Sequence, residues 1–130
     1  AYQEQGYLII IVTNQSGISR GYYSEEDFSI LSRWMVEHFK ALGIIIEKIY
    51  HCPHHESIEG ACECRKPEPG MFLEAQKTYD LDMKGSVMIG DNERDIEAAL
   101  KAGVGMNILL SAEASESKAD QMIHSLRELL

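Results

Sequence analysis

The chain has 130 residues, of which 45% are hydrophobic, so its length suits one domain with a single core. Its 21 acidic side chains against 12 basic ones give a net charge of -9, which disfavours nonspecific binding to nucleic acid. No apolar run approaches the roughly 18 residues of a membrane span, and the polar start does not resemble a secretion signal. We therefore expect a cytoplasmic monomer that binds neither nucleic acid nor membrane, although a phosphorylated small molecule remains compatible with this charge.

The elements expected from hydrophobic periodicity alternate between strands and helices. Short apolar runs predict strands, and helical spacing of apolar residues predicts helices. We expect strands over 7–12, 44–50, 86–90 and 104–110, helices over 24–43, 70–79 and 92–102, and a short strand and helix within 121–130. Ser24 should cap the first helix, with Asp27 completing a capping box. This alternation predicts an α/β fold with a doubly wound, Rossmann-like parallel sheet in three layers.

Chemically reactive residues follow three of these strands. Thr13 follows the first strand, Cys52 follows the second and Asp91 follows the third. Ligands of open parallel sheets bind beyond the carboxyl ends of the strands. We therefore expect the three loops to build one site.

Residues 52–64 contain all three cysteines of the chain and two histidines. Cys52-x-His54 and Cys62-x-Cys64 supply three thiolates and one imidazole. Four such ligands complete the tetrahedral coordination of zinc and leave no open position. We therefore predict a structural zinc ion that holds this loop in place. His54 is preferred to His55 because its one-residue gap mirrors that of the cysteine pair. The alternative is that these are ordinary loop residues. The odd cysteine count, in a chain without a secretion signal, argues against a disulfide framework.

Two further groups of residues suit a phosphate and a hard cation. Thr13 offers a hydroxyl, and residues 14–17 offer amides and backbone N–H groups. Lys66 adds a point charge and Arg65 a bidentate fork for anionic oxygens. Asp91 and Asp95, one helical turn apart after a strand, suit magnesium. The alternative is that these two carboxylates only cap the helix that follows.

Together these residues resemble a known family. Thr13-Asn14, Lys66 and Gly90-Asp91-x-x-x-Asp95 are similar to motifs II, III and IV of the haloacid dehalogenase (HAD) superfamily of phosphotransferases. The zinc loop joined to Arg-Lys-Pro resembles the branch that contains heptose-bisphosphate phosphatases and histidinol-phosphate phosphatase domains. Within that branch, residues 14–23 and 65–71 look more like the heptose enzymes.

The resemblance implies a magnesium-dependent phosphoric monoester hydrolase. Its expected reaction removes the 7-phosphate of a heptose 1,7-bisphosphate through an aspartyl-phosphate, in the synthesis of nucleotide-activated heptose for lipopolysaccharide or surface glycans. The implied catalytic residues are Thr13, Lys66 and Asp91. The implied substrate-binding residues are Thr13, Asn14, Gln15, Ser16, Arg65, Lys66 and Asn92. The implied metal residues are Asp91 for magnesium, supported by Asp95, and Cys52, His54, Cys62 and Cys64 for zinc.

The chain departs from the family pattern in one respect. Motif I, an Asp-x-Asp pair that supplies the nucleophile and the acid, should precede Thr13. Here the first aspartate is Asp27, and the only Asp-x-Asp pair lies at 80–82. We therefore expect residues 1–130 to be one N-terminally incomplete domain that is inactive alone, with its nucleophile upstream. The alternatives are a histidinol-phosphate phosphatase of the same branch and a non-catalytic, zinc-stabilised module that binds a sugar phosphate.

Overall fold

The computed structural model describes residues 2–55, 62–111 and 116–129. The chain divides into two compact units, Ala1–Cys62 and Glu63–Leu130. The expectation that residues 1–130 form one domain stays a prediction. Among the described residues, no helix combines the length and the apolarity that crossing a bilayer requires.

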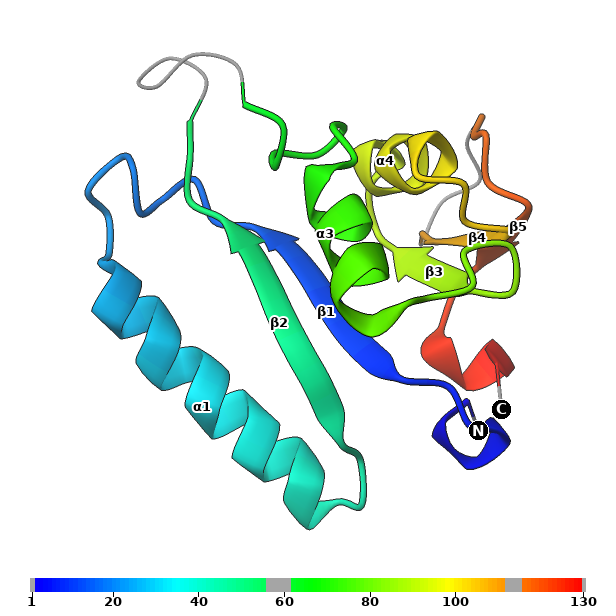
Figure 1. Ribbon diagram of the computed structural model, residues 1–130, viewed down its shortest axis with the longest axis horizontal. Helices are drawn as coiled ribbons and strands as arrows, with labels where there is room; N and C mark the ends of the chain where they lie inside the picture. The colour runs from blue at the N-terminus through cyan, green and yellow to red at the C-terminus, as the bar shows by residue number, and fades with distance from the viewer. Residues whose placement is uncertain (1, 56–61, 112–115, 130) are drawn as a thin grey trace. The chain divides into compact units, whose positions relative to one another are not determined.

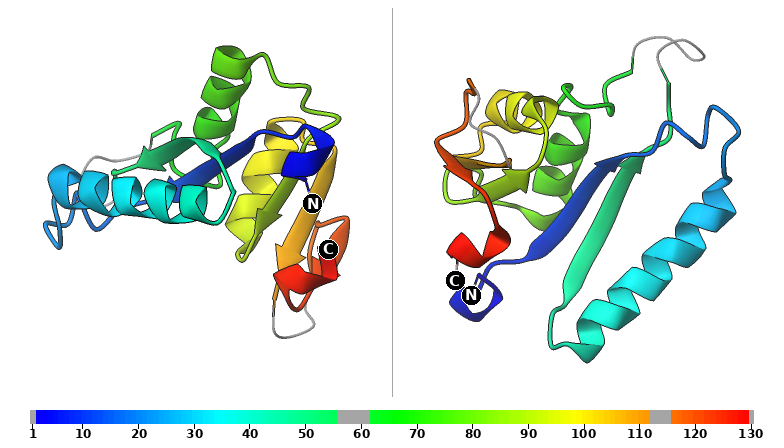
Figure 2. Two further views of the ribbon diagram at one scale, coloured as in Figure 1. Left: turned by 90° about the horizontal axis from the view of Figure 1, so that it is seen from below. Right: turned by 180° about the vertical axis from the view of Figure 1, so that it is seen from behind.

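The first unit is a parallel strand–helix–strand arrangement. β1 (Ile9–Asn14) pairs in parallel with β2 (Ile46–Cys52), and α1 (Glu25–Ala41) connects them and lies alongside β2 (Figures 1 and 2). A short 3₁₀ helix, η1 (Gln3–Gln5), precedes β1. The ladder ends with Asn14 opposite Cys52. The candidate residues after β1 and those after β2 therefore start from the same edge of this sheet.

Helix α1 begins where the sequence predicts. Ser24 Oγ accepts a hydrogen bond from the Asp27 N–H, and Asp27 Oδ2 accepts one from the Ser24 N–H, each at 3.0 Å. This confirms the capping box. Gly43 follows the helix with a φ of +84°, a conformation that favours a residue without Cβ. Phe28 is buried, and its ring centroid lies 4.5 Å from that of His51, which anchors the first turn of α1 to β2.

The second unit contains a three-stranded parallel sheet in the order β3-β4-β5. Its core includes Ile96, Ile108 and Ile123, each at most 1% exposed. Helix α4 packs on β3 and β4. The elements are α3 (Gly70–Tyr79), β3 (Val87–Gly90), α4 (Glu93–Lys101), β4 (Met106–Leu110), β5 (Gln121–Ile123) and the 3₁₀ helix η2 (Leu126–Leu129).

The α/β class with parallel strands is confirmed, with small shifts at the strand ends. Thr13 and Asn14 lie within β1, and Cys52 lies within β2, whereas we predicted that these residues follow the strands. The reason is that the backbone ladder continues through the polar residues, pairing Thr13 with His51. The described strands are divided between two sheets, and their union in one doubly wound sheet stays a prediction.

Candidate functional site

Four metal-ligand side chains cluster at the end of β2. The ligand atoms of Cys52, His54, Cys62 and Cys64 all lie within 4.8 Å of one another. Cys52 Sγ is 3.6 Å from Cys62 Sγ and 3.7 Å from His54 Nδ1. Neighbouring ligands around a tetrahedral zinc ion, with bonds of about 2.0–2.3 Å, are separated by about 3.5–3.8 Å. The separations of Cys52 from Cys62 and from His54 therefore fit neighbouring ligands of a structural zinc ion.

The structure distinguishes the two adjacent histidines. His54 belongs to the cluster, whereas His55 Nε2 is hydrogen-bonded to the Arg20 guanidinium group. His51 is not part of the metal-ligand cluster. Its Nε2 lies 2.7 Å from Glu25 Oε2. This geometry favours His54 as the fourth zinc ligand.

The oxidation state of the cluster differs from what the sequence suggests. Cys52 and Cys64 are disulfide-bonded in the structure, although the cysteine count argues against a disulfide framework. Cys62 retains its thiol. Because a cysteine binds a metal as a thiolate, the disulfide and the four-ligand zinc site are alternative states of the same residues. The expectation that no disulfide forms was wrong because sulfur atoms that lie close enough to share a zinc ion are also close enough to form a disulfide.

The loop after β1 is fastened to the start of the cysteine-containing segment by backbone hydrogen bonds. The Gln15 N–H donates to Cys52 O at 2.7 Å, and the Ser19 N–H donates to Pro53 O at 3.3 Å. A metal ion that fixes Cys52 would therefore also steady the loop that carries the candidate phosphate-binding groups.

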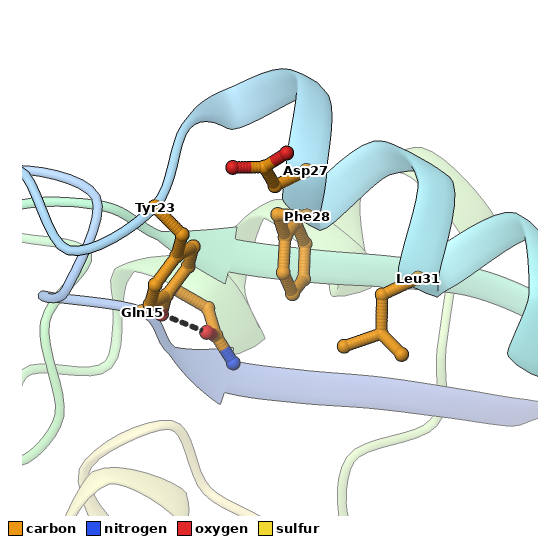
Figure 3. Close-up of a pocket in the computed structure, with 5 residues that line it drawn as sticks. All are labelled: Gln15, Tyr23, Asp27, Phe28 and Leu31. Atoms are coloured by element: carbon orange, nitrogen blue, oxygen red, sulfur yellow. Dashed lines mark hydrogen bonds between the residues drawn. The ribbon is translucent and has the colours of Figure 1, made fainter.

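The side chains of this loop are linked to one another. Gln15 Nε2 donates to Thr13 Oγ1 at 2.9 Å, and Thr13 Oγ1 donates to Asn14 O at 3.3 Å. The Tyr23 hydroxyl donates to Gln15 Oε1 (Figure 3). Sequence reasoning gives Tyr23 no role, because a hydroxyl brought in by a loop leaves no periodic signal. A cavity of about 340 Å³ lies at the start of α1, lined by Gln15, Tyr23, Asp27, Phe28 and Leu31.

In the second unit, Arg65 and Lys66 lie in a turn that is closed against the start of α3. The Gly70 N–H donates to Glu63 O and the Glu68 N–H donates to Arg65 O, each at 2.8 Å. A Cβ on Gly70 would collide with the Glu63 backbone, so this closure needs glycine. Arg65 Nη1 is buried without an acceptor in the described part of the chain. An unpaired buried donor costs about 1–3 kcal/mol, a cost that an anionic ligand would remove.

An ion pair joins this turn to the start of α4. Lys66 Nζ lies 2.5 Å from Asp95 Oδ1, and both side chains are 11% exposed. Asp95 Oδ2 also accepts the Asn92 N–H at 3.2 Å, while Asn92 Oδ1 accepts the Arg94 N–H at 3.0 Å. Asp95 therefore both completes the capping box of α4 and holds Lys66. Asp95 takes part in capping α4 but does not only cap it, and the N-cap is Asn92 rather than Asp91.

Asp91 follows β3 directly and remains accessible. It is exposed, and its carboxylate makes no hydrogen bond or ion pair with the residues that the structure describes. Magnesium is held in proteins by one or two carboxylates together with waters. An accessible carboxylate at a strand end fits that requirement, whereas Asp95 is already engaged by Lys66 and Asn92.

Gly90 should be required for the Lys66–Asp95 ion pair. A Cβ at position 90 would lie 2.6 Å from both Asp95 Cβ and Asp95 Oδ2, so alanine must displace the carboxylate. We expect Gly90→Ala to lower the free energy of unfolding by about 1–3 kcal/mol, measured by urea denaturation. Thr78→Ala, at an exposed position of α3, is the control and should change it by less than about 0.5 kcal/mol. Equal losses in both variants would contradict the steric argument.

The structure brings the candidate residues together within each unit. In the first unit, Thr13 and Asn14 pair with the last residues of β2, Gln15 is hydrogen-bonded to Cys52, and Ser16 follows in the same loop. The second unit groups the two turns joined by the ion pair, which carry Arg65, Lys66, Asp91, Asn92 and Asp95. The convergence of the two groups on one site stays a prediction.

Comparison with known proteins identifies the class. A family model described as HAD-hydrolase-like matches residues 63–129, which include the Lys66–Asp95 pair and the accessible Asp91. The chain belongs to this HAD-like hydrolase family, as the motifs suggest.

Within the family, the chain is similar to phosphatases of heptose bisphosphates. It is 49% identical to D-glycero-alpha-D-manno-heptose-1,7-bisphosphate 7-phosphatase of Campylobacter jejuni, over 97% of this chain and 71% of the relative. It is 44% identical to D-glycero-beta-D-manno-heptose-1,7-bisphosphate 7-phosphatase of Vibrio cholerae, over 99% of this chain and 75% of the relative. These relatives confirm the resemblance and place the chain among phosphoric monoester hydrolases.

A solved structure agrees with this grouping. The crystal structure of D,D-heptose 1,7-bisphosphate phosphatase from B. bronchiseptica, complexed with magnesium and phosphate, matches with a TM-score of 0.85 and 27% identity. The match covers 98% of this chain and 74% of that chain. It supports the HAD-like fold of the two units.

Proposed function

We propose that this protein removes the 7-phosphate of D-glycero-D-manno-heptose 1,7-bisphosphate. The observation that carries the proposal is an identity of 38% to 49%, over most of the chain, with relatives named heptose-1,7-bisphosphate 7-phosphatases. The names of these relatives include both the alpha and the beta anomer, so the proposal covers the bisphosphate without choosing between them.

In this proposal, the phosphate is received by groups that are positioned before the reaction begins. Lys66 Nζ neutralises charge that develops on the transferred phosphoryl group, and the Thr13 hydroxyl donates a hydrogen bond to it. The buried Nη1 of Arg65, which lacks an acceptor in the described residues, supports a role in recognising the sugar phosphate. The remaining substrate contacts come from Asn14, Gln15, Ser16 and Asn92.

Two metal sites accompany these contacts. Asp91 would hold magnesium, which when bound stabilises the charge of a phosphoryl transition state. Asp95 supports that region by orienting Lys66 through their 2.5 Å ion pair. The structural zinc ion would be held by Cys52, His54, Cys62 and Cys64 in their reduced state.

The reaction in this proposal requires a nucleophilic aspartate of motif I, which residues 1–12 do not contain. Its carboxylate oxygen attacks phosphorus to form an aspartyl-phosphate, and the bond from phosphorus to the sugar oxygen breaks. A second aspartate, two residues later, protonates the leaving oxygen and then activates the water that hydrolyses the intermediate. Residues 1–130 alone should therefore bind phosphate without turning over the substrate.

The proposed setting follows from the substrate. A heptose monophosphate produced in this way is an intermediate for nucleotide-activated heptose, which supplies lipopolysaccharide or surface glycans. We place the enzyme in the cytoplasm as a monomer whose partner is a phosphorylated small molecule, without nucleic acid or membrane.

A phosphate-release assay on the full-length protein encoded by the gene tests the proposal, and a full-length sequence without an Asp-x-Asp pair before Thr13 would contradict hydrolysis by this mechanism. The substrates are the alpha and beta heptose 1,7-bisphosphates and histidinol phosphate, each with added magnesium. We expect kcat/KM for one heptose bisphosphate to exceed that for histidinol phosphate by at least about 100-fold. Asp91→Asn, which removes a charged metal ligand, should abolish turnover.

Two results would contradict the proposal. Preferential turnover of histidinol phosphate would assign the protein to the other activity of the branch. Calorimetric binding of heptose bisphosphate without phosphate release would identify a non-catalytic binding module.

A further inference from the structure

Three side chains of the first unit form a hydrogen-bonded chain that ends at Thr13. The Tyr23 hydroxyl donates to Gln15 Oε1, and Gln15 Nε2 donates to Thr13 Oγ1 at 2.9 Å. Figure 3 shows the amide oxygen of Gln15 facing Tyr23 and its nitrogen pointing away from the ring. All three residues are partly buried, so competition from water is reduced.

The direction of this chain decides what Thr13 can do. A threonine hydroxyl has one hydrogen to donate and two lone pairs that accept. The Gln15 N–H occupies a lone pair, which leaves the hydrogen of Thr13 for another acceptor. In the structure that acceptor is Asn14 O, at a long 3.3 Å. A phosphoryl oxygen, which is charged and a stronger acceptor, would displace this contact easily.

Tyr23 fixes that direction because a glutamine amide can be rotated end for end. With the amide reversed, Gln15 would present its oxygen to Thr13 and would capture the threonine hydrogen. In the structure the Tyr23 hydroxyl donates to the amide oxygen, and this hydrogen bond exists only while the oxygen faces the tyrosine; after reversal the hydroxyl would have to accept instead. The observed hydrogen bond of Tyr23 therefore stabilises the orientation in which Gln15 donates to Thr13 and the threonine hydrogen stays available.

The backbone around Gly17 places the tyrosine ring at this point. A Cβ on Gly17 would collide with the ring of Tyr23, so the ring lies directly on the glycine. The Tyr22 N–H donates to Gly17 O at 2.9 Å and closes the loop next to it. The loop sequence Gly17 to Tyr23 is thus folded so that the hydroxyl of Tyr23 reaches back to Gln15.

We propose that Tyr23 is a positioning residue for phosphoryl transfer, acting through Gln15 to keep the Thr13 hydroxyl pointed as a donor at the transferred group. The inference rests on the proposed function, in which Thr13 contacts the phosphoryl group. It also gives the Gln15 side chain a more specific role than general substrate contact.

The test is a double-mutant cycle in the complete protein. Tyr23→Phe keeps the ring on Gly17 and removes only the hydroxyl, and we expect kcat to fall about tenfold with KM unchanged, because the effect operates in the transition state. In a Thr13→Val background, which lacks the hydroxyl being oriented, Tyr23→Phe should have no further effect on kcat. Tyr22→Phe is the matched control: its ring is exposed, and its kcat should equal that of the parent.

The side-chain amide of Gln15 provides a readout that does not require turnover. In NMR spectra of the complete protein, its Nε2 protons should show distinct shifts and slowed exchange, and both features should be lost in Tyr23→Phe but kept in Tyr22→Phe. Unchanged kcat in Tyr23→Phe, or equal losses with and without the Thr13 hydroxyl, would overturn the inference. If the parent hydrolyses no heptose bisphosphate, the proposed function fails, and unchanged Gln15 signals would separately reject the hydrogen-bonded chain.

Discussion

Replacing Lys66 by methionine is expected to lower kcat for phosphate release by about 100–1,000-fold, the usual effect of removing one group that stabilises transition-state charge. The Lys66 side chain is 11% exposed, and its Nζ is held 2.5 Å from Asp95 Oδ1. If Lys66 has the proposed role, an ammonium group that is nearly buried and held in place would act strongly on phosphoryl charge and would need little reorganisation. Steady-state kinetics on the complete protein measure the effect.

The same substitution should also destabilise the second unit. Methionine fills a similar volume but leaves the Asp95 carboxylate nearly buried without its cation, a change that costs about 3–5 kcal/mol in other buried pairs. Asp95→Asn on the Lys66→Met background should restore part of this stability, because it removes the uncompensated charge, without restoring kcat. Urea denaturation of the two variants separates the loss of fold stability from the loss of catalysis.

Lys101→Met is the matched control for this experiment. Lys101 Nζ lies 3.4 Å from Glu68 Oε1, and the two side chains are about half exposed, at 48% and 50%. An exposed pair of this kind contributes about 0–1 kcal/mol, so the control should keep its kcat and nearly all of its stability. A Lys66→Met enzyme with the kcat of this control would refute the role given to Lys66.

Replacing His54 by alanine is expected to remove about one zinc ion per chain and to lower the melting temperature substantially. A ligand present at about 1,000 times its Kd stabilises the folded state by about 4 kcal/mol. For a protein of this size, that loss lowers Tm by roughly 10–20 °C. Zinc content is measured by elemental analysis and Tm by calorimetry. Both require a thiol reductant, because the disulfide-bonded state of Cys52 and Cys64 cannot supply thiolates.

His55→Ala offers a control at the adjacent position. His55 is hydrogen-bonded to Arg20 and is not part of the cluster, so this variant should keep its zinc and most of its stability. Loss of zinc from His55→Ala but not from His54→Ala would show that His55, rather than His54, is the zinc ligand. A reduced parent protein that contains no zinc after purification without chelator would reject the metal site itself.

Loss of zinc should also displace the loop after β1, residues 13–17, which carries the candidate phosphate-binding groups. The Gln15 N–H donates to Cys52 O at 2.7 Å, and the Gln15 side chain reaches Thr13 Oγ1 at 2.9 Å. A displacement of Cys52 is therefore transmitted through one residue to the hydroxyl that is proposed to contact the phosphoryl group. The proposed zinc ion would thus influence Thr13 without taking part in the proposed chemistry.

Local patterns predicted the secondary structure well because they act over a few residues. The Ser24–Asp27 capping box, the stop at Gly43 and the span of α3 all follow from neighbouring residues. The strand ends were less accurate, since the pairing of Thr13 with His51 depends on a strand some forty residues away in sequence. No local preference of a polar residue can report such a partner.

For the candidate site too, the sequence predicted some features and the tertiary structure decided the others. The sequence by itself determined the family, through motif residues at fixed spacings around Thr13, Lys66 and Asp91, and it identified the cysteine and histidine cluster. Only the tertiary structure decided which side chains meet: Lys66 with Asp95, Tyr23 with Gln15, and His54 rather than His55 with the cysteines. Spacing restricts the positions of Cα atoms within one element. The direction of a side chain between elements is set by packing and by the hydrogen bonds available where it points.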